Sequence, residues 1–370
     1  MPAGLYLHVP FCLTKCTYCD FYAINDNDLI SPWLEALGQE MASCQNAWIN
    51  PFDTFYLGGG TPSFLAAQDL DAIFARIRDH FWLTADAEIT LEANPDDITP
   101  EKLRFWKELG VNRLSLGVQS LNDTELQFLG RRHTAAQARQ VIVLAREAGF
   151  DNLGVDLIYA LPGQTEAGWL ANLQAVLAFE SEHLSCYQLT IAKNTPLGKK
   201  QARGEIEPLD EERQRSLFLL TAEYLEGRGY RHYEISNFAR GERHISRHNT
   251  KYWQQVPYLG LGPGAHSFDG RVRRWNVSAV AAYCRLLGEG RVPTAGEELL
   301  TPSQRHLETL CLGLRTKNGV ALADLTHFPQ ARQTLTSFCE AGLLTIEQDR
   351  ARPTRQGFLV ADSLSLMLSE

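Results

Sequence analysis

The residues best suited to chemistry are three cysteines near the start of the chain, Cys12, Cys16 and Cys19, in the stretch FCLTKCTYC. Their spacing, C-x3-C-x2-C, places three thiols in one short loop. Iron–sulfur clusters are normally closed by four cysteine thiolates. Three thiolates would hold three irons of a 4Fe–4S cubane and leave the fourth iron open to a small molecule. S-adenosylmethionine (SAM) fits that role, because its amino and carboxylate groups chelate iron and its reductive cleavage yields a 5′-deoxyadenosyl radical.

Two simpler interpretations of this loop stand beside the first. The three thiolates and His8 would form a reasonable zinc site, although His8 lies in an extended run before the loop. The three thiols would otherwise be reduced and structural. The other five cysteines are scattered, and we expect them to be small buried residues in a reducing compartment. They are Cys44, Cys186, Cys284, Cys311 and Cys339.

Short β-rich runs that alternate with helical patterns must position this loop. Strands are expected at residues 5–9, 53–57, 88–91, 113–118, 152–158 and 184–191. Helices are expected at 33–45, 67–80, 100–109, 134–148, 167–179 and 210–226. Six consecutive βα units with right-handed crossovers predict an α/β fold, a partial and open parallel (β/α)6 barrel.

The predicted barrel places the unusual sequences on one face, because chemistry in such folds lies at the carboxyl ends of the strands. The cysteine loop follows the first strand, GGGTP the second and EANPD the third. GVQS, DLIYALPGQ and TIAKNTP follow the fourth, fifth and sixth. We therefore expect one site at this face.

Three domains are predicted. Residues 1–237 form the barrel, 238–290 form an irregular connecting segment, and 291–370 form a mainly helical, winged-helix-like domain with a hairpin around 347–353. Residues 301–370 carry seven basic and seven acidic side chains. A phosphate-binding face needs concentrated positive charge, so the alternative function of a nucleic-acid-binding protein is not favoured.

The bulk composition excludes other classes of protein. Apolar residues make up 44% of the chain and the formal net charge is −9, so non-specific binding to nucleic acid or anionic membrane is not expected. No apolar run is long enough for a membrane helix, and the N-terminal sequence does not resemble a signal peptide. We expect a cytoplasmic protein without stable membrane insertion.

Taken together, the cysteine loop, GGGTPS, EANPD, GVQS and DLIYALPGQT resemble the radical SAM superfamily over essentially the whole chain. The similarity is to the branch that contains the oxygen-independent coproporphyrinogen oxidase HemN and the haem chaperone HemW. It implies a 4Fe–4S cluster on the three cysteines and a neighbouring SAM site. The SAM-binding residues expected are Tyr6, Tyr18, Gly59, Gly60, Thr61, Glu92, Gln119, Arg131 and Asp156.

The residues themselves support part of this set. Glycines after the second strand permit close approach of a ligand, and Glu92 at a strand end can accept from ribose hydroxyls or an ammonium. Gln119 and Asp156 interrupt apolar runs, so they need a partner. The alternatives are a plain glycine turn, a water-facing Glu92, and a structural salt bridge between Arg131 and Asp156.

A second motif, SRHNTKYW, contains the HNxxYW pattern that resembles the mark of the HemW branch and implies haem binding there. His248 is a competent axial ligand of haem iron. Asn249, Tyr252 and Trp253 would accompany it, and His266 is a second candidate ligand. The alternative is a packed polar and aromatic segment that closes the barrel, with His248 hydrogen-bonded in the core.

Two departures argue against the oxidase. The long segment that precedes its cysteine loop has no counterpart before Cys12, and Phe21 stands where the oxidase carries a further cysteine. We therefore expect a haem chaperone that binds a 4Fe–4S cluster, SAM and haem and delivers haem to acceptor proteins. Neither departure affects the three cysteines, so we still expect the protein to be able to cleave SAM. The alternative is oxidative decarboxylation of coproporphyrinogen III. The cluster implies an electron donor as a partner. The family resemblance implies a homodimer.

Overall fold

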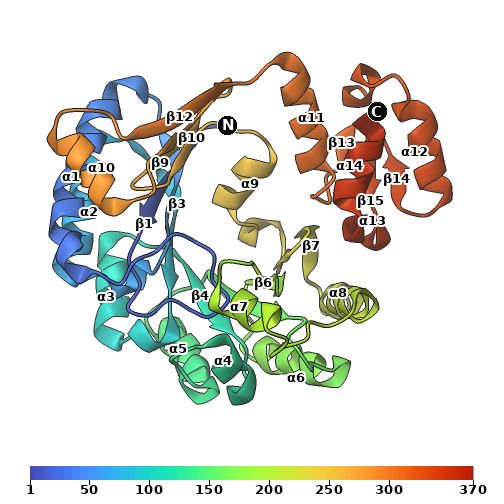
Figure 1. Cartoon of the computed structure of the whole chain (residues 1–370), viewed down its shortest axis with the longest axis horizontal. Helices are drawn as coiled ribbons and strands as arrows, with labels where there is room; N and C mark the ends of the chain where they lie inside the picture. The colour runs from blue at the N-terminus through green and yellow to red at the C-terminus, as the bar shows by residue number, and fades with distance from the viewer. Residues whose placement is uncertain (370) are drawn as a thin grey trace.

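The computed structural model describes residues 1–369. Its main sheet has twelve strands in the order β12, β11, β10, β9, β1, β2, β3, β4, β5, β6, β8, β7, which Figure 1 shows as an open arc. The six central strands from β1 to β6 are parallel. They are β1 (Ala3–Val9), β2 (Phe52–Gly59), β3 (Leu83–Ala93), β4 (Arg113–Gln119), β5 (Leu153–Tyr159) and β6 (His183–Gln188). The predicted α/β fold with a partial parallel barrel is confirmed.

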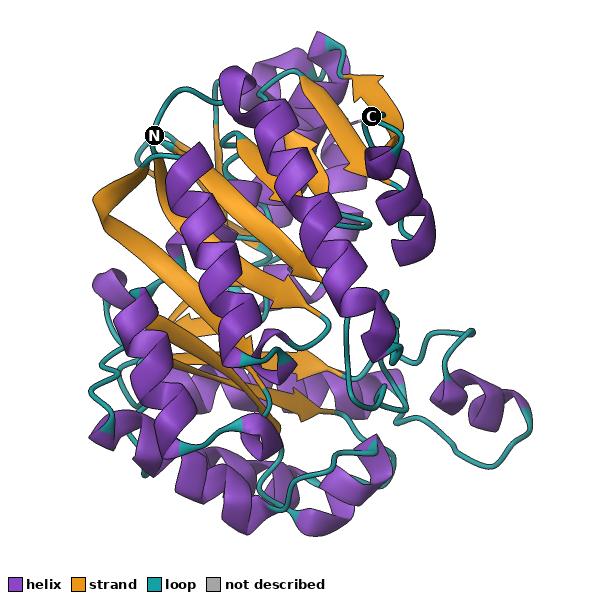
Figure 2. Ribbon diagram, turned by 90° about the vertical axis from the view of Figure 1, so that its left-hand side faces the viewer, coloured by secondary structure: helices purple, strands orange, loops and turns teal. Residues whose placement is uncertain are grey.

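Helices cover the outer face of the arc, and Figure 2 shows them in front of the strands. The six predicted helices are α1 (Ile30–Cys44), α2 (Ala67–His80), α3 (Pro100–Leu109), α5 (Ala135–Glu147), α6 (Glu166–Leu177) and α8 (Glu211–Glu226). Two short helices were not expected, α4 (Asp123–Leu129) and α7 (Pro196–Ala202), in the loops after β4 and β6. Side-chain oxygens cap α3, α5, α6 and α8 at their N-terminal ends.

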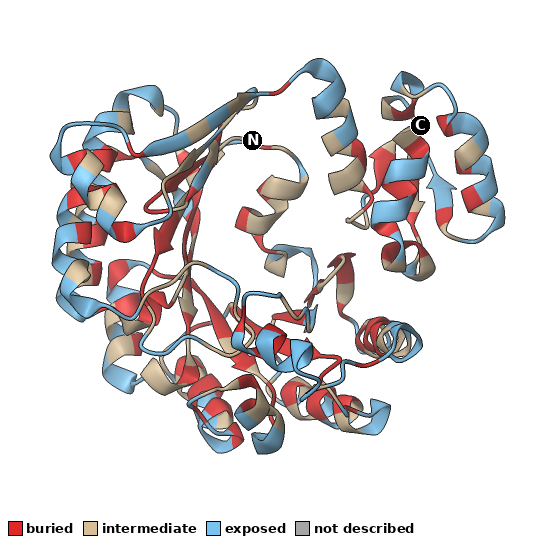
Figure 3. Ribbon diagram, in the orientation of Figure 1, coloured by how far each residue is buried: buried red, intermediate tan, exposed pale blue. Residues whose placement is uncertain are grey.

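Each central strand has one apolar and one polar face. On β4, Leu114, Leu116 and Val118 are fully buried, and Figure 3 shows many buried residues along the central strands. The alternate residues of β4 face the inside of the barrel, because side chains alternate along a strand. The hydrophobic core therefore lies between sheet and helices, and the barrel interior is left for polar groups.

The segment predicted to be irregular, residues 238–290, instead extends the sheet. β9 pairs in parallel with β1, and β10 and β11 continue as antiparallel neighbours. β12, from the predicted C-terminal domain, pairs with β11 and completes this edge. These strands have three to six residues each, and β9 and β12 contain glycine, so they lack a readable alternation. The elements are β7 (Arg231–Glu234), β8 (Asn237–Ala239), α9 (Arg247–Trp253), β9 (Tyr258–Leu261), β10 (His266–Phe268), β11 (Val272–Asn276), α10 (Val280–Gly288) and β12 (Thr294–Leu299).

Helix α9, which carries the HNxxYW motif, lies inside the arc (Figure 1). The Glu88 carboxylate accepts hydrogen bonds from the backbone N–H groups of Arg247 and His248 at its first turn. At Gly4 a Cβ atom would lie 2.9 Å from Lys251 Cδ, so a glycine is needed for α9 to approach β1. The helix thus closes the barrel at the amino ends of the strands, opposite the cysteine loop.

The C-terminal unit has its own hydrophobic core, formed among others by Leu310, Leu335 and Phe338. It is mainly helical, with a three-stranded antiparallel sheet. Its elements are α11 (Pro302–Gly313), β13 (Val320–Ala321), α12 (Ala331–Glu340), β14 (Leu344–Glu347), β15 (Arg350–Pro353), α13 (Arg355–Leu359) and α14 (Ala361–Ser369). The domain boundaries placed at 237 and 290 stay predictions. Across residues 1–369, none of the helices combines the length and apolar character that a bilayer crossing requires.

A buried carboxyl, Glu40 on α1, ties the sheet extension to the barrel. It accepts hydrogen bonds from Gly262 N (2.8 Å), Asn276 Nδ2 (2.5 Å) and the Tyr283 hydroxyl (2.5 Å). Burial raises the pKa of Glu40 from its ordinary value of 4.5 to about 7, although the three hydrogen bonds oppose the shift. The folded state therefore holds this proton more tightly than the unfolded state.

We expect the stability of the wild type to fall relative to Glu40→Gln as pH rises from 4.5 to 7. A pKa raised from 4.5 to about 7 corresponds to about 3 kcal/mol of the free energy of unfolding. Urea unfolding of both proteins at pH 5 and pH 8 measures the difference, and the glutamine variant cancels the effect of other titrating groups. A difference independent of pH would contradict the assignment.

Candidate functional site

A cavity of about 390 Å³ lies at the carboxyl ends of the central strands. The structure brings eleven of the predicted cluster and SAM residues together on its wall. They are Cys12, Cys16, Tyr18, Cys19, Gly59, Gly60, Thr61, Glu92, Gln119, Arg131 and Asp156. Tyr6 is not among them. Its ring stacks at 6.2 Å on that of Tyr56, which does line the cavity.

The three thiols stand in a loop that is fixed at both ends. Cys12 N donates to Ile24 O at 2.9 Å, and Thr17 N donates to Leu129 O at 3.4 Å. Burial raises the pKa values of the Cys12 and Cys19 thiols, and a hydrogen bond from Thr61 lowers that of Cys12 in part. Thiols that face a cavity and receive hydrogen bonds fit the environment of iron-bound thiolates. The residues present therefore fit a cubane cluster.

The zinc interpretation required His8 as a ligand, and the structure uses both ring nitrogens of His8 elsewhere. Its Nε2 lies 3.1 Å from Tyr22 O and its Nδ1 lies 3.1 Å from the Tyr6 hydroxyl. Within residues 1–369, no three His, Cys, Asp or Glu side chains converge on one metal-ion position. In a cubane cluster each cysteine binds a different iron, so the three sulfur atoms do not meet at a single metal position.

The glycine loop packs against the cysteine loop. Gly60 N donates to Val9 O, and Thr61 N donates to Phe11 O, both at 2.8 Å. A Cβ on Gly60 would lie 2.6 Å from Phe11 O, and Gly59 has φ +108°. From the sequence, we predicted that these glycines permit the close approach of a ligand. The structure gives a different reason, the approach of the backbone before the first cysteine.

Glu92 points into the cavity and holds the glycine loop. It accepts from the Tyr56 hydroxyl at 2.7 Å and from Gly59 N at 3.1 Å. Burial, with the nearby Asp156 charge as a smaller cause, raises the pKa of Glu92 to about 7. The alternative of a strand-end carboxylate facing bulk water is therefore not supported.

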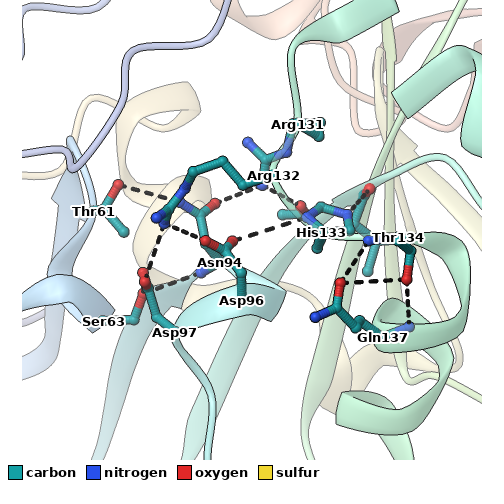
Figure 4. Close-up of polar contacts among 12 residues, drawn as sticks. Thr61, Ser63, Asn94, Asp96, Asp97, Arg131, Arg132, His133, Thr134 and Gln137 are labelled. Carbon is teal, nitrogen blue, oxygen red and sulfur yellow. Dashed lines mark hydrogen bonds and ion pairs between the residues drawn. The ribbon is translucent and has the colours of Figure 1, made fainter. Parts of the chain in front are cut away.

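A chain of hydrogen bonds joins two of the thiols, and Figure 4 shows its central part. The Thr61 hydroxyl donates to Cys12 Sγ at 3.2 Å and accepts from Asn94 Nδ2 at 3.3 Å. Arg131 donates through Nη2 to Asn94 Oδ1 at 2.6 Å and through Nη1 to Cys16 Sγ at 3.2 Å. Asn94 was not singled out in the sequence. The signal was its place in EANPD, two residues after Glu92 and directly after the end of β3.

The expected alternative for Arg131, a salt bridge to Asp156, does not occur among residues 1–369. Asp156 instead accepts from the Ser115 hydroxyl at 3.2 Å. Burial raises the pKa of Asp156. Arg131 also donates a hydrogen bond to Gly117 O at 2.6 Å. The Arg131 guanidinium and the Asp156 carboxyl group therefore occupy separate positions on the cavity wall.

Arg113 was also missed by the sequence argument. It is 1% exposed, lines the cavity, and leaves Nε and Nη1 without a hydrogen-bond partner. Its signal was the period of two along RLSLGVQ, which places it on the same face as Ser115 and Gln119. Gln119 itself has φ +67°, an unusual value for a residue other than glycine. Strain of this kind is frequent at ligand sites.

The structure places the predicted haem residues in different surroundings. His248 is buried, with Nδ1 2.8 Å from Thr54 Oγ1 and Nε2 2.9 Å from the Tyr252 hydroxyl. Burial lowers the pKa of His248 to about 3. With both nitrogens engaged, this arrangement does not support the prediction that His248 ligates haem iron; it agrees with the alternative of a core histidine. His266 is exposed on β10 and stacks on Trp275.

The other two motif residues face two different cavities. Asn249 lines the cavity of the cysteine loop. Trp253 lines a second cavity, between α9 and the C-terminal unit. The motif therefore forms a wall between two hollows of the molecule.

Comparison with family models gives two matches. Residues 6–175 match the radical SAM superfamily, and residues 300–360 match the HemN C-terminal domain. Among solved structures, the fold is similar to that of the Escherichia coli coproporphyrinogen III oxidase HemN, a radical SAM enzyme. That similarity has a TM-score of 0.87 at 22% identity and covers 100% of this chain and 90% of the other.

Full-length relatives are more similar in sequence. The haem chaperone HemW of Mycobacterium tuberculosis (strain H37Rv) is 36% identical, over 98% of this chain and 94% of the relative. HemW of Bacillus subtilis (strain 168) is 33% identical, over 97% of both chains. The mitochondrial radical S-adenosyl methionine domain-containing protein 1 of Bos taurus is 34% identical, over 99% of this chain and 87% of the relative.

Proposed function

The chain belongs to the HemW family of the radical SAM superfamily, and from that premise we propose that it is a haem chaperone. It would hold a 4Fe–4S cluster and SAM at the cysteine cavity, bind haem, and pass haem to acceptor proteins. The observation that carries this proposal is the full-length similarity to HemW proteins. The residues gathered around one cavity support it independently.

Cys12, Cys16 and Cys19 would hold three irons of the cluster. When bound, the cluster supplies the electron that cleaves SAM to a 5′-deoxyadenosyl radical. Thr61 and Arg131 donate hydrogen bonds to two of the sulfurs and would tune the reduction potential. An external electron donor would have to reach the exposed side of the loop.

Glu92, Gln119 and Asp156 would position SAM. Glu92 presents its carboxylate to the cavity with Tyr56 and Gly59 holding it in place. Asp156 stands on β5, with β4 between it and the strand of Glu92, and it accepts a hydrogen bond from Ser115 of β4. Fixed carboxylates suit ribose hydroxyls or an ammonium group, since both are hydrogen-bond donors.

The second candidate function is oxygen-independent oxidation of coproporphyrinogen III. The likeness to the HemN structure favours it as a fold. Against it stands Phe21, 71% exposed beside the cluster loop, where the oxidase is expected to carry a cysteine.

The test uses anaerobically purified full-length protein with its cluster. We expect added haem to give a Soret shift, and the loaded protein to convert an apo haem protein to its holo form. Incubation with coproporphyrinogen III, SAM and reductant is expected to yield no protoporphyrinogen. Haem that neither binds nor moves to the acceptor, or formation of protoporphyrinogen, would contradict the proposal.

A further inference from the structure

A second cavity, of about 670 Å³, is larger than the one at the cysteine loop. It lies between α9, β7 and the C-terminal unit, where Figure 1 shows α9 facing α11 and β13. Two backbone hydrogen bonds join β7 and the residue after it to the segment that follows α11 beside this cavity. Ile235 N donates to Arg315 O at 3.0 Å, and Lys317 N donates to Tyr233 O at 2.9 Å. A volume of this size suits a small-molecule ligand.

The wall of this cavity is positive in a protein of net negative charge. It carries five lysine or arginine side chains and three carboxylates. Three of the cations form ion pairs on the wall, Arg231 with Glu242, and Arg247 and Lys251 with Asp53. The remaining cations are Lys317 and Arg350, and the remaining carboxylate is Asp324.

Lys317 and Arg350 form no ion pair within residues 1–369. Arg350 is held in place by its donation to Asn318 O at 2.8 Å and to Gly319 O at 2.9 Å. Carbonyl oxygens satisfy its hydrogen bonds without neutralising its charge. Within the described chain, Lys317 and Arg350 are thus two unpaired positive charges on the cavity wall that an anionic ligand could neutralise.

The same cavity also offers an aromatic surface. Trp253, the last residue of α9, lines the cavity, and its buried Nε1 has no hydrogen-bond partner. Tyr233, Ile245 and Val320 add apolar surface. Aromatic faces stack on planar ligands, and an indole N–H needs an acceptor when buried.

We infer that this cavity is the haem-binding site, with the porphyrin ring against Trp253 and the propionates toward Lys317 and Arg350. The inference rests on the proposed function, and it places haem on the opposite side of α9 from the cluster. It assigns the motif residue Trp253 a direct contact and leaves His248 as a core residue.

Haem titration of the full-length, cluster-containing protein tests this site through the Soret band. Lys317→Glu and Trp253→Ala are each expected to weaken haem affinity about tenfold or more, because a charge-assisted hydrogen bond or a stacked aromatic contact is lost. Lys200→Glu, which reverses an exposed lysine on α7 outside both cavities, is the matched control and should bind haem as the wild type does. Lys317→Ala is a second, milder variant. Thermal unfolding and iron content establish that each variant is folded.

Haem dimethyl ester, which lacks the propionate charges, separates the two contributions. We expect the wild type to prefer haem over the ester by about tenfold, and Lys317→Glu to lose that preference. Wild-type affinity in Lys317→Glu, Lys317→Ala and Trp253→Ala would overturn the site while leaving haem binding intact. No Soret shift in the wild type would instead overturn the proposed function and the site together.

Discussion

Cys16→Ser protein, purified without oxygen, is expected to contain no 4Fe–4S cluster. Cys16 lines the cavity with the two other loop cysteines, and Arg131 donates to its sulfur at 3.2 Å. With one of three protein ligands gone, the cubane would keep only two corners. We expect iron and acid-labile sulfide to fall to background, and SAM cleavage with them.

The matched control is Cys284→Ser. Cys284 is a half-buried thiol on α10 outside the cavity, and burial raises its pKa. It should retain full iron and sulfide content. Equal cluster content in both variants would contradict the three-thiolate site, and loss in both would point to general instability of the cluster.

SAM is expected to bind the wild type more weakly as pH falls below 7. The pKa of Glu92 is raised to about 7 by burial, and only its ionised form accepts hydrogen bonds from SAM on both oxygens. At lower pH, Glu92 must therefore lose its proton before SAM binds. Between pH 8 and pH 6 we expect roughly a tenfold loss of affinity.

Glu92→Gln should bind SAM about 10- to 100-fold more weakly at pH 8 and show no such pH dependence, because a hydrogen bond to a charged group is lost. Anaerobic calorimetry with SAM measures both effects. Glu101→Gln, an exposed substitution on α3, is the control. A Glu92→Gln protein with wild-type affinity at pH 8 would remove Glu92 from the SAM site.

The parallel half of the fold was predictable because its strands and helices are long enough to show their period. The β4 sequence RLSLGVQ alternates along its whole length, and α8 begins at Glu211, one residue after its predicted start. The resemblance to the radical SAM superfamily was confirmed by the comparisons. β10, with three residues, offers no such period.

The positions of single side chains inside the barrel were less predictable. His248 and Thr54 are 194 positions apart, yet they share a hydrogen bond of 2.8 Å. A histidine beside aromatics suits haem as well as it suits a core, and only tertiary packing separates the two. Arg113 was predicted only as the first residue of a strand, whereas the structure buries it at the cavity.

The arrangement places two hollows on the two sides of α9. Asn249 lines one cavity, and Thr250, Lys251 and Trp253 line the other. The Tyr252 hydroxyl and Glu88 hold His248 between them. In the proposed function, α9 is therefore the element that the SAM site and the haem site share.

The most direct test is the electron paramagnetic resonance spectrum of the dithionite-reduced, anaerobically purified protein, recorded with and without SAM. A cubane held by Cys12, Cys16 and Cys19 leaves one iron for SAM, so we expect a 4Fe–4S signal whose g values change when SAM is added. A cluster signal that is indifferent to SAM, or a protein that contains zinc without iron or sulfide, would contradict the open-iron site.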